Sequence, residues 1–265
     1  MSDLVPKGQG AQRNVINRFD RYTFEPEDYE LEKIKTQVTE VFPKTIINVV
    51  KSPDLPMDYS MNPYQGCEHG CSYCFARPTH EFWGYSAGID FERKLMVKKN
   101  APELLEKTFQ KKSYIPKPIM LSGNTDCYQP IERQFEITRK LLQVCLDYRH
   151  PVSIITKNAL ILRDLDILEK MAEKNLISVN MSIPTLNEDL RRVMEPRTST
   201  AKNKLKAIEV LSGKNIPVNV MIAPVIPALT SEESLFIMKS VSDAGARSCG
   251  YTLVRLNDTV EPVFV

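Results

Sequence analysis

The chain has 265 residues, of which 42% are apolar and 26% are charged, and its net charge at pH 7 is +2. This balance is ordinary for a globular protein, and it tolerates an anionic substrate or nucleic acid without requiring one. No stretch approaches the ~20 consecutive apolar residues of a membrane span, and the first residues lack the apolar core of a secretory signal. We therefore expect a cytoplasmic protein with reduced cysteines and no membrane partner.

The N-terminal part of the chain is polar and rich in proline and charge. We expect it to wrap the rest of the protein, with one helical turn around residues 28–33 and one strand near residues 45–50. Two prolines within residues 52–58 indicate a hinge. The predicted divisions are an extension (1–58), a main domain (59–256) and a short C-terminal tail (257–265).

The main domain alternates apolar strand-like runs with helical patterns. A first strand near residues 61–64 precedes five more, at residues 118–122, 152–156, 177–183, 218–223 and 248–256. The predicted helices cover residues 101–111, 131–148, 165–174, 202–212 and 231–242. Six strands separated by helices imply a parallel sheet with right-handed crossovers. We therefore predict an α/β fold, a partial (β/α)6 TIM-like barrel, whose chemistry lies at the carboxyl ends of the strands.

Three cysteines, Cys67, Cys71 and Cys74, follow the first predicted strand with the spacing C-x3-C-x2-C. Thiolates so close together on a glycine-flanked loop can converge on a soft metal centre. Three are one short of the four that close a [4Fe–4S] cluster or a structural zinc site, so one position stays open for another ligand. The alternative is a zinc site completed by His69 or a distant residue, although zinc cysteines usually come in separated C-x2-C pairs.

In this context, the cysteine motif resembles the radical S-adenosylmethionine (radical SAM) superfamily. Several further stretches resemble its subgroup related to spore photoproduct lyase, the DNA repair photolyase-like proteins. These stretches are residues 7–11, 17–19, 62–71, 76–80, 124–126, 128–130, 156–157 and 195–198. The likeness spans roughly residues 59–256. Relatives of this kind run on past the last strand, so we expect either a naturally short chain or one that lacks a C-terminal segment.

The resemblance implies a [4Fe–4S] cluster on Cys67, Cys71 and Cys74, with S-adenosyl-L-methionine bound at the fourth iron. One electron, from a donor such as flavodoxin or ferredoxin, would cleave the cosubstrate to a 5′-deoxyadenosyl radical that abstracts hydrogen from a substrate. By resemblance, one substrate class is a nucleic-acid base. The competing substrate class is a peptide or small metabolite. The alternative function is that of a non-catalytic iron–sulfur protein for electron transfer or sensing.

The cosubstrate needs an aromatic slot for adenine and donors for its carboxylate. Tyr73 and Phe75, which flank Cys74, are placed to contact the adenine. At predicted strand ends, Lys157 offers a point charge, and Ser182 and Arg197 offer hydrogen-bond donors to a carboxylate. For Lys157 and Arg197, the alternative is an ordinary salt bridge at a strand end.

Asn124 and Asp126, after the second predicted strand, carry acceptors for the ammonium group or the ribose hydroxyls. Asp126 has an alternative role as the cap of the helix expected from Ile131. Cys127 lies in the same loop and carries the weaker hypothesis of a hydrogen donor to a product radical. We expect Cys145 and Cys249 to be core residues.

Seven lysines form a positive stretch around the first predicted helix. We interpret it as a solvated helix face, with a phosphate-contacting strip as the alternative. These residues are Lys94, Lys98, Lys99, Lys107, Lys111, Lys112 and Lys117.

Overall fold

The computed structural model describes residues 8–11, 14–15, 17, 19, 36–52, 57–257 and 259–264. The predicted helical turn at residues 28–33 lies outside these residues. The strand expected near residues 45–50 is present as β2, Ile47–Val49.

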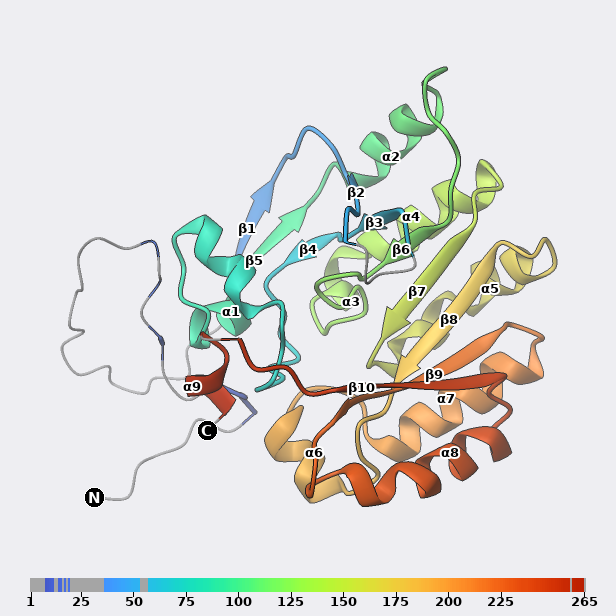
Figure 1. Ribbon diagram of the computed structural model, residues 1–265. Helices are drawn as coiled ribbons and strands as arrows, with labels where there is room; N and C mark the ends of the chain where they lie inside the picture. The colour runs from blue at the N-terminus through green and yellow to red at the C-terminus, as the bar shows by residue number, and fades with distance from the viewer. Residues whose placement is uncertain are drawn as a thin grey trace.

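The main sheet has seven strands in the order β10-β9-β8-β7-β6-β3-β2 (Figure 1). All neighbouring pairs are parallel except β2 with β3. The strands other than β2 are β3 (Tyr59–Met61), β6 (Ile119–Leu121), β7 (Val152–Thr156), β8 (Ile177–Ser182), β9 (Val218–Val225) and β10 (Ser248–Leu253). Six parallel strands joined through helices confirm the predicted partial (β/α)6 barrel, which stays open between β10 and β2.

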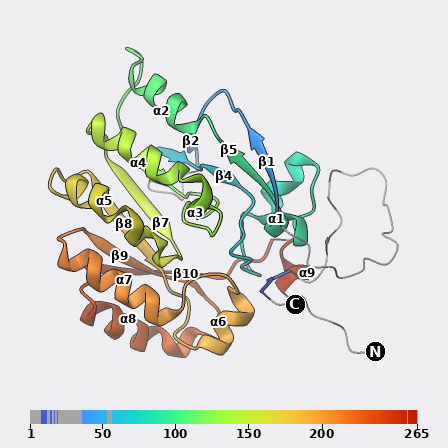
Figure 2. The same ribbon diagram turned by 180° about the vertical axis from the view of Figure 1, so that it is seen from behind.

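Helices cover the outer face of this curved sheet, as the view from behind shows (Figure 2). They are α2 (Ala101–Phe109), α4 (Ile137–Asp147), α5 (Leu165–Ala172), α7 (Ala201–Gly213) and α8 (Ser234–Asp243). Each buries an apolar stripe against the sheet; in α4 this stripe includes Ile137, Leu141, Leu142 and Cys145. Burial of one such Leu or Ile side chain contributes roughly 1.5–3 kcal/mol. Among the described residues, no helix is long and apolar enough to cross a membrane.

Three expectations need correction. The helix predicted over residues 131–148 is interrupted at Glu136, whose φ of 51° separates α3 (Glu132–Phe135) from α4. The break lets the buried Glu132 side chain accept hydrogen bonds from Tyr64 and from the backbone N–H of Thr138. The helix expected from Ser231 begins with a 3-10 turn, η3 (Ser231–Glu233), before it continues as α8. A further 3-10 helix, η2 (Ala159–Asp164), precedes α5. Cys249 is exposed because β10 is an edge strand, so it is not a core residue.

A second sheet of three strands lies beside the barrel and was not expected from the sequence. It pairs β1 (Gln37–Val41) in parallel with β5 (Lys94–Lys98), and β5 antiparallel with β4 (Tyr64–Gln65). Although β5 begins and ends with lysine, its central residues Leu95, Met96 and Val97 are buried. The other short elements not predicted are η1 (Arg77–Trp83), α1 (Ile89–Arg93), α6 (Glu188–Met194) and α9 (Glu261–Phe264).

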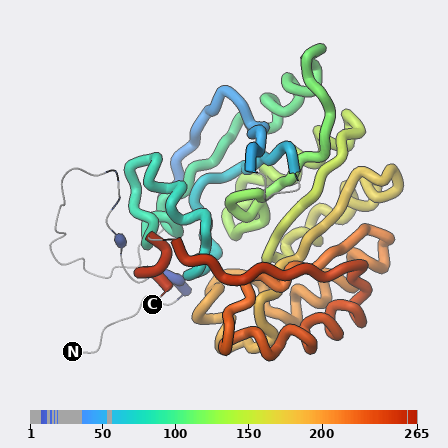
Figure 3. The backbone as a smooth tube through the Cα atoms, in the orientation of Figure 1, coloured from blue at the N-terminus to red at the C-terminus, as the bar shows by residue number. Residues whose placement is uncertain are grey.

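The hydrophobic core fills the space between the main sheet and its helices. Two smaller apolar clusters surround the cysteine loop, one around Cys71 and Tyr73 and one around Cys67 and Phe91. The C-terminal segment runs back from β10 towards this loop (Figure 3), and Phe264 of α9 packs against the first of the two clusters.

Candidate functional site

The loop that carries the three cysteines is shaped by glycine. Gly66 and Gly70 have φ values of 77° and 67°, in the left-handed region that favours glycine. A β-carbon on Gly66 would also lie 2.8 Å from the Leu95 side chain. The backbone N–H of Cys67 donates to the carbonyl of Phe91 (2.9 Å), so the loop is anchored to α1.

All three cysteines are free thiols, with Cys67 and Cys71 buried and Cys74 partly exposed. Burial raises the pKa of Cys74 to about 11, and the neighbouring Cys67 adds to the shift. Burial also raises the pKa of Cys71, reinforced by Glu195 and by the other two cysteines. The three sulfurs are therefore close enough to influence one another, inside an apolar surrounding.

A buried ion pair between Arg77 and Glu92 holds the cysteine loop in place. The Nη2 of Arg77 lies 2.5 Å from Oε1 of Glu92, and both side chains are fully buried. The Nε of Arg77 donates to the carbonyl of Cys71 at 3.0 Å. Glu92 in turn accepts from the backbone N–H groups of Gly10 (3.2 Å) and Ala11 (2.7 Å).

Residues 8–11, here called the N-terminal strap, therefore lie against the cysteine loop. The Nε of Arg197 donates to the carbonyl of Gly8 at 2.6 Å, and its backbone N–H donates to the carbonyl of His69 at 3.2 Å. Arg93 holds the side chain of Gln9 at 2.7 Å. Arg197, predicted as a clamp for a carboxylate ligand, is thus placed as an anchor of the strap.

Lys157 and Tyr73, both predicted to contact the cosubstrate, meet at Glu195. The hydroxyl of Tyr73 donates to Oε1 of Glu195, and the Nζ of Lys157 lies 2.8 Å from the same oxygen. The Nζ of Lys204 lies 3.0 Å from Oε2. Burial alone would raise the pKa of Glu195, but Lys157 and Lys204 hold it well below its usual value. The carboxylate therefore stays ionised within the protein.

The sequence did not single out Glu195 and Lys204 as functional residues. One signal for Lys204 was available, because it shares the apolar stripe of α7 with Ala201, Ile208 and Leu211. A lysine in such a stripe is buried only when it has a partner of opposite charge.

Asp126 is buried and its oxygens are already occupied. Oδ1 accepts from the Thr156 hydroxyl and the Tyr128 N–H, both at 2.8 Å, while Oδ2 accepts from the Lys157 N–H at 2.7 Å. Oδ2 also lies 3.3 Å from Nδ1 of His69. Asp126 thus ties the end of β7 to the cysteine loop.

The other ring nitrogen of His69, Nε2, faces the side-chain amide of Asn158 at 3.2 Å. Because Oδ1 of Asn158 accepts from Leu160 and Ser199, its amide nitrogen points to His69 and donates. Both ring nitrogens therefore face protein groups, which argues against His69 as a fourth metal ligand.

The remaining predicted residues lie in different surroundings. Asn124 donates its backbone N–H to Asn62 (2.8 Å), and its side chain reaches Thr79 at 3.4 Å. Ser182 is buried at the carboxyl end of β8, whereas Phe75 is 60% exposed. Cys127 is fully buried and packs in the main core, not in the two clusters around the triad.

Four of the seven lysines in the basic stretch have partners in the structure. Lys94 pairs with Asp90, Lys99 with Glu40, and Lys117 with Asp58, while Lys98 donates to the carbonyl of Asn62. These pairings favour the interpretation of a solvated, internally paired surface over a phosphate-contacting strip.

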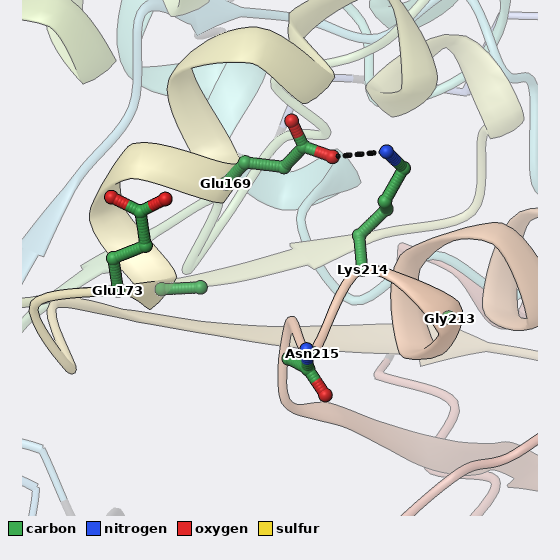
Figure 4. Close-up of a pocket in the computed structure, with 6 residues that line it drawn as sticks. Glu169, Glu173, Gly213, Lys214 and Asn215 are labelled. Atoms are coloured by element: carbon green, nitrogen blue, oxygen red, sulfur yellow. Dashed lines mark ion pairs between the residues drawn. The ribbon is translucent and has the colours of Figure 1, made fainter.

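A surface cavity of about 430 Å³ lies between the C-terminal ends of α5 and α7 (Figure 4). An ion pair of 2.9 Å joins two of its lining residues, Glu169 and Lys214. The cavity lies near the amino ends of β8 and β9, whereas Lys157 and Ser182 lie at carboxyl ends. It is therefore separate from the cysteine site.

Comparison with known proteins defines the class. Residues 61–240 match the radical SAM superfamily, and the chain belongs to it. An uncharacterized protein of Mycobacterium tuberculosis (strain H37Rv) is 34% identical over 210 residues, covering 78% of this chain and 62% of the relative. An uncharacterized protein of Methanocaldococcus jannaschii is 31% identical over 199 residues, covering 75% of this chain and 71% of the relative. The chain thus spans about three fifths of the length of the mycobacterial relative.

Among solved structures, a spore photoproduct lyase variant superposes with a TM-score of 0.68 at 16% identity, covering 92% of this chain and 71% of the other. Another variant, with bound AdoMet and dinucleoside spore photoproduct, gives 0.67 at 16% identity with the same coverage. This likeness shows that the fold is shared, as the sequence predicted.

Proposed function

We propose that this protein is a radical SAM enzyme that holds a [4Fe–4S] cluster on Cys67, Cys71 and Cys74. The observation that carries the proposal is the triad of free thiols, two of them buried, beside the pair of Lys157 with the buried Glu195. Three closely spaced thiolates suit a cluster that keeps one iron open, whereas structural zinc requires four ligands and His69 already faces Asp126 and Asn158.

When bound, the cluster and S-adenosyl-L-methionine supply an electron and a 5′-deoxyadenosyl radical that abstracts hydrogen from a substrate. The protein supplies position and exclusion of water. Lys157 and Ser182 lie at the carboxyl edge of the sheet, suited to a carboxylate, and Tyr73 and Phe75 offer ring faces to adenine. Asn124 is suited to the ammonium group or the ribose, and the apolar clusters around the triad keep water away.

The decisive experiment is the EPR spectrum of anaerobically reconstituted, dithionite-reduced protein, with and without S-adenosyl-L-methionine. A reduced-cluster signal that changes on addition supports the proposal. An EPR signal that does not change when the cosubstrate is added would favour an electron-transfer or sensing protein. Zinc in place of iron would show that the protein holds no cluster. Cys71→Ser removes one of the three proposed cluster ligands. Cys249→Ser, altered at an exposed thiol on β10, is its matched control.

For the substrate, a nucleic-acid base is our first candidate, because the superposing lyase binds a dinucleoside photoproduct. A peptide or small metabolite is the second, favoured by the internal pairing of the basic stretch. Binding to DNA that weakens steeply with salt would support the first class. A cytoplasmic location with a flavodoxin or ferredoxin as electron donor fits a cluster that must be reduced before each turnover.

A further inference from the structure

Glu195 has two ammonium partners for one carboxylate. Lys157 lies 2.8 Å from Oε1 and Lys204 lies 3.0 Å from Oε2. The Glu195 side chain is fully buried, so its carboxylate depends on these ammonium groups for its counter-charge. Because two ammonium groups serve one carboxylate, one of them can meet a further anion without leaving Glu195 unpaired.

The two lysines differ in their freedom to meet that anion. The Lys157 side chain is 19% exposed, and its Nζ lies 5.5 Å from the centre of the Tyr73 ring beside the cysteine loop. Lys204 is 2% exposed and projects from the inward face of α7, where its ammonium donates to Glu195. Lys157 can therefore turn towards a bound ligand, whereas Lys204 stays with the carboxylate.

We propose that Lys204 is a positioning residue: it keeps Glu195 paired while Lys157 turns to the carboxylate of S-adenosyl-L-methionine. Without Lys204, departure of Lys157 would leave a buried, unpaired carboxylate, so Glu195 would hold Lys157 back. The inference rests on the proposed function, because the incoming anion is the carboxylate of the cosubstrate.

The test is the dissociation constant of S-adenosyl-L-methionine for the anaerobically reconstituted protein, measured by calorimetry. Lys204→Met is expected to weaken binding about tenfold or more, because binding must now break the pairing of Glu195. The double variant Glu195→Gln/Lys204→Met is expected to regain wild-type affinity, since a neutral amide does not hold Lys157. Lys206→Met, on the same helix but 63% exposed, is the matched control and should bind like the wild type.

The outcomes separate the two proposals. If the wild-type protein carries a cluster but does not bind the cosubstrate, the proposed function fails. If the wild type binds and Lys204→Met binds equally well, or if the double variant is as weak as the single one, the role of Lys204 is overturned. Loss of iron from Lys204→Met would also overturn it, by assigning Lys204 to the cluster. Should Lys204→Met fail to fold, Glu195→Gln alone decides, because it is expected to bind at least as tightly as the wild type.

Discussion

Gly10 lies against Gly70 so closely that a β-carbon on Gly10 would sit 1.6 Å from the carbonyl oxygen of Gly70. This contact joins the N-terminal strap to the middle of the cysteine loop. The same strap donates to Glu92, which pairs with Arg77, and Arg77 holds the carbonyl of Cys71. The strap, the ion pair and the loop are therefore connected by direct contacts.

Gly10→Ala should displace the strap. No rearrangement of side chains relieves the clash, because the opposing atom belongs to the backbone. We expect a loss of about 1–3 kcal/mol in the free energy of unfolding, and faster hydrogen exchange in residues 66–75. Gly213→Ala is the control: apart from Gly213 itself, its chain neighbours and the backbone of its own helix, no atom of the described residues lies within 4 Å of the position its β-carbon would take, so this change should be neutral or slightly stabilising. Unaltered exchange in Gly10→Ala would contradict the strap's role.

Glu92→Gln should cost far more than its small change in shape suggests. It leaves the guanidinium of Arg77 buried without a counter-charge, which costs about 3–5 kcal/mol in the free energy of unfolding. Urea denaturation measures this loss. Glu40→Gln removes one partner of an exposed pair with Lys99 and should change stability by less than about 1 kcal/mol. If both variants lost a similar free energy of unfolding, the buried Arg77–Glu92 pair would be no more important for stability than the exposed Lys99–Glu40 pair.

The stability should depend on the protonation of His80. Burial lowers the pKa of His80 from 6.5 to about 4, against the smaller opposing effect of Asp90. Between these pH values the unfolded chain binds more protons, so stability falls as the pH is lowered through this window. The wild type should lose roughly 2–3 kcal/mol in the free energy of unfolding between pH 7.5 and pH 4.5 through this histidine. His80→Phe lacks the group and should not show this loss.

Urea denaturation at both pH values checks this expectation. His150→Phe is the comparison, because burial also lowers the pKa of His150, by a smaller amount. An unchanged pH profile in His80→Phe would show that His80 is not held neutral by the fold.

Cys127→Ala separates a packing residue from a hydrogen donor. The Cys127 side chain is enclosed in the main core, so its loss should cost roughly 1 kcal/mol and leave the iron content unchanged. Its backbone is held separately, by the hydroxyls of Ser122 and Thr138. The products formed from a substrate decide its chemical role. An altered product distribution would support donation of hydrogen, whereas loss of iron would contradict the separation of Cys127 from the triad.

Most of the barrel was predictable because its signals are local. The strand at residues 152–156 is present as predicted, and α7 differs from its prediction by one residue at each end. The second sheet was missed because Lys94 and Lys98 make β5 look like a charged surface segment. The break at Glu136 was missed because it depends on Glu132 meeting Tyr64, a residue far away in the chain.

The cysteine triad and the alternation of strands and helices could be recognised in the sequence alone, because spacing and periodicity depend on neighbouring residues, and the resemblance to the radical SAM superfamily rests on such motifs. The partners of the charged groups, in contrast, depend on the tertiary structure. Glu92 meets a strap 81 residues away, and Lys157 meets Glu195 and, through it, Lys204. Burial forces each charge to find a counter-charge, and which one it finds depends on how distant segments pack together.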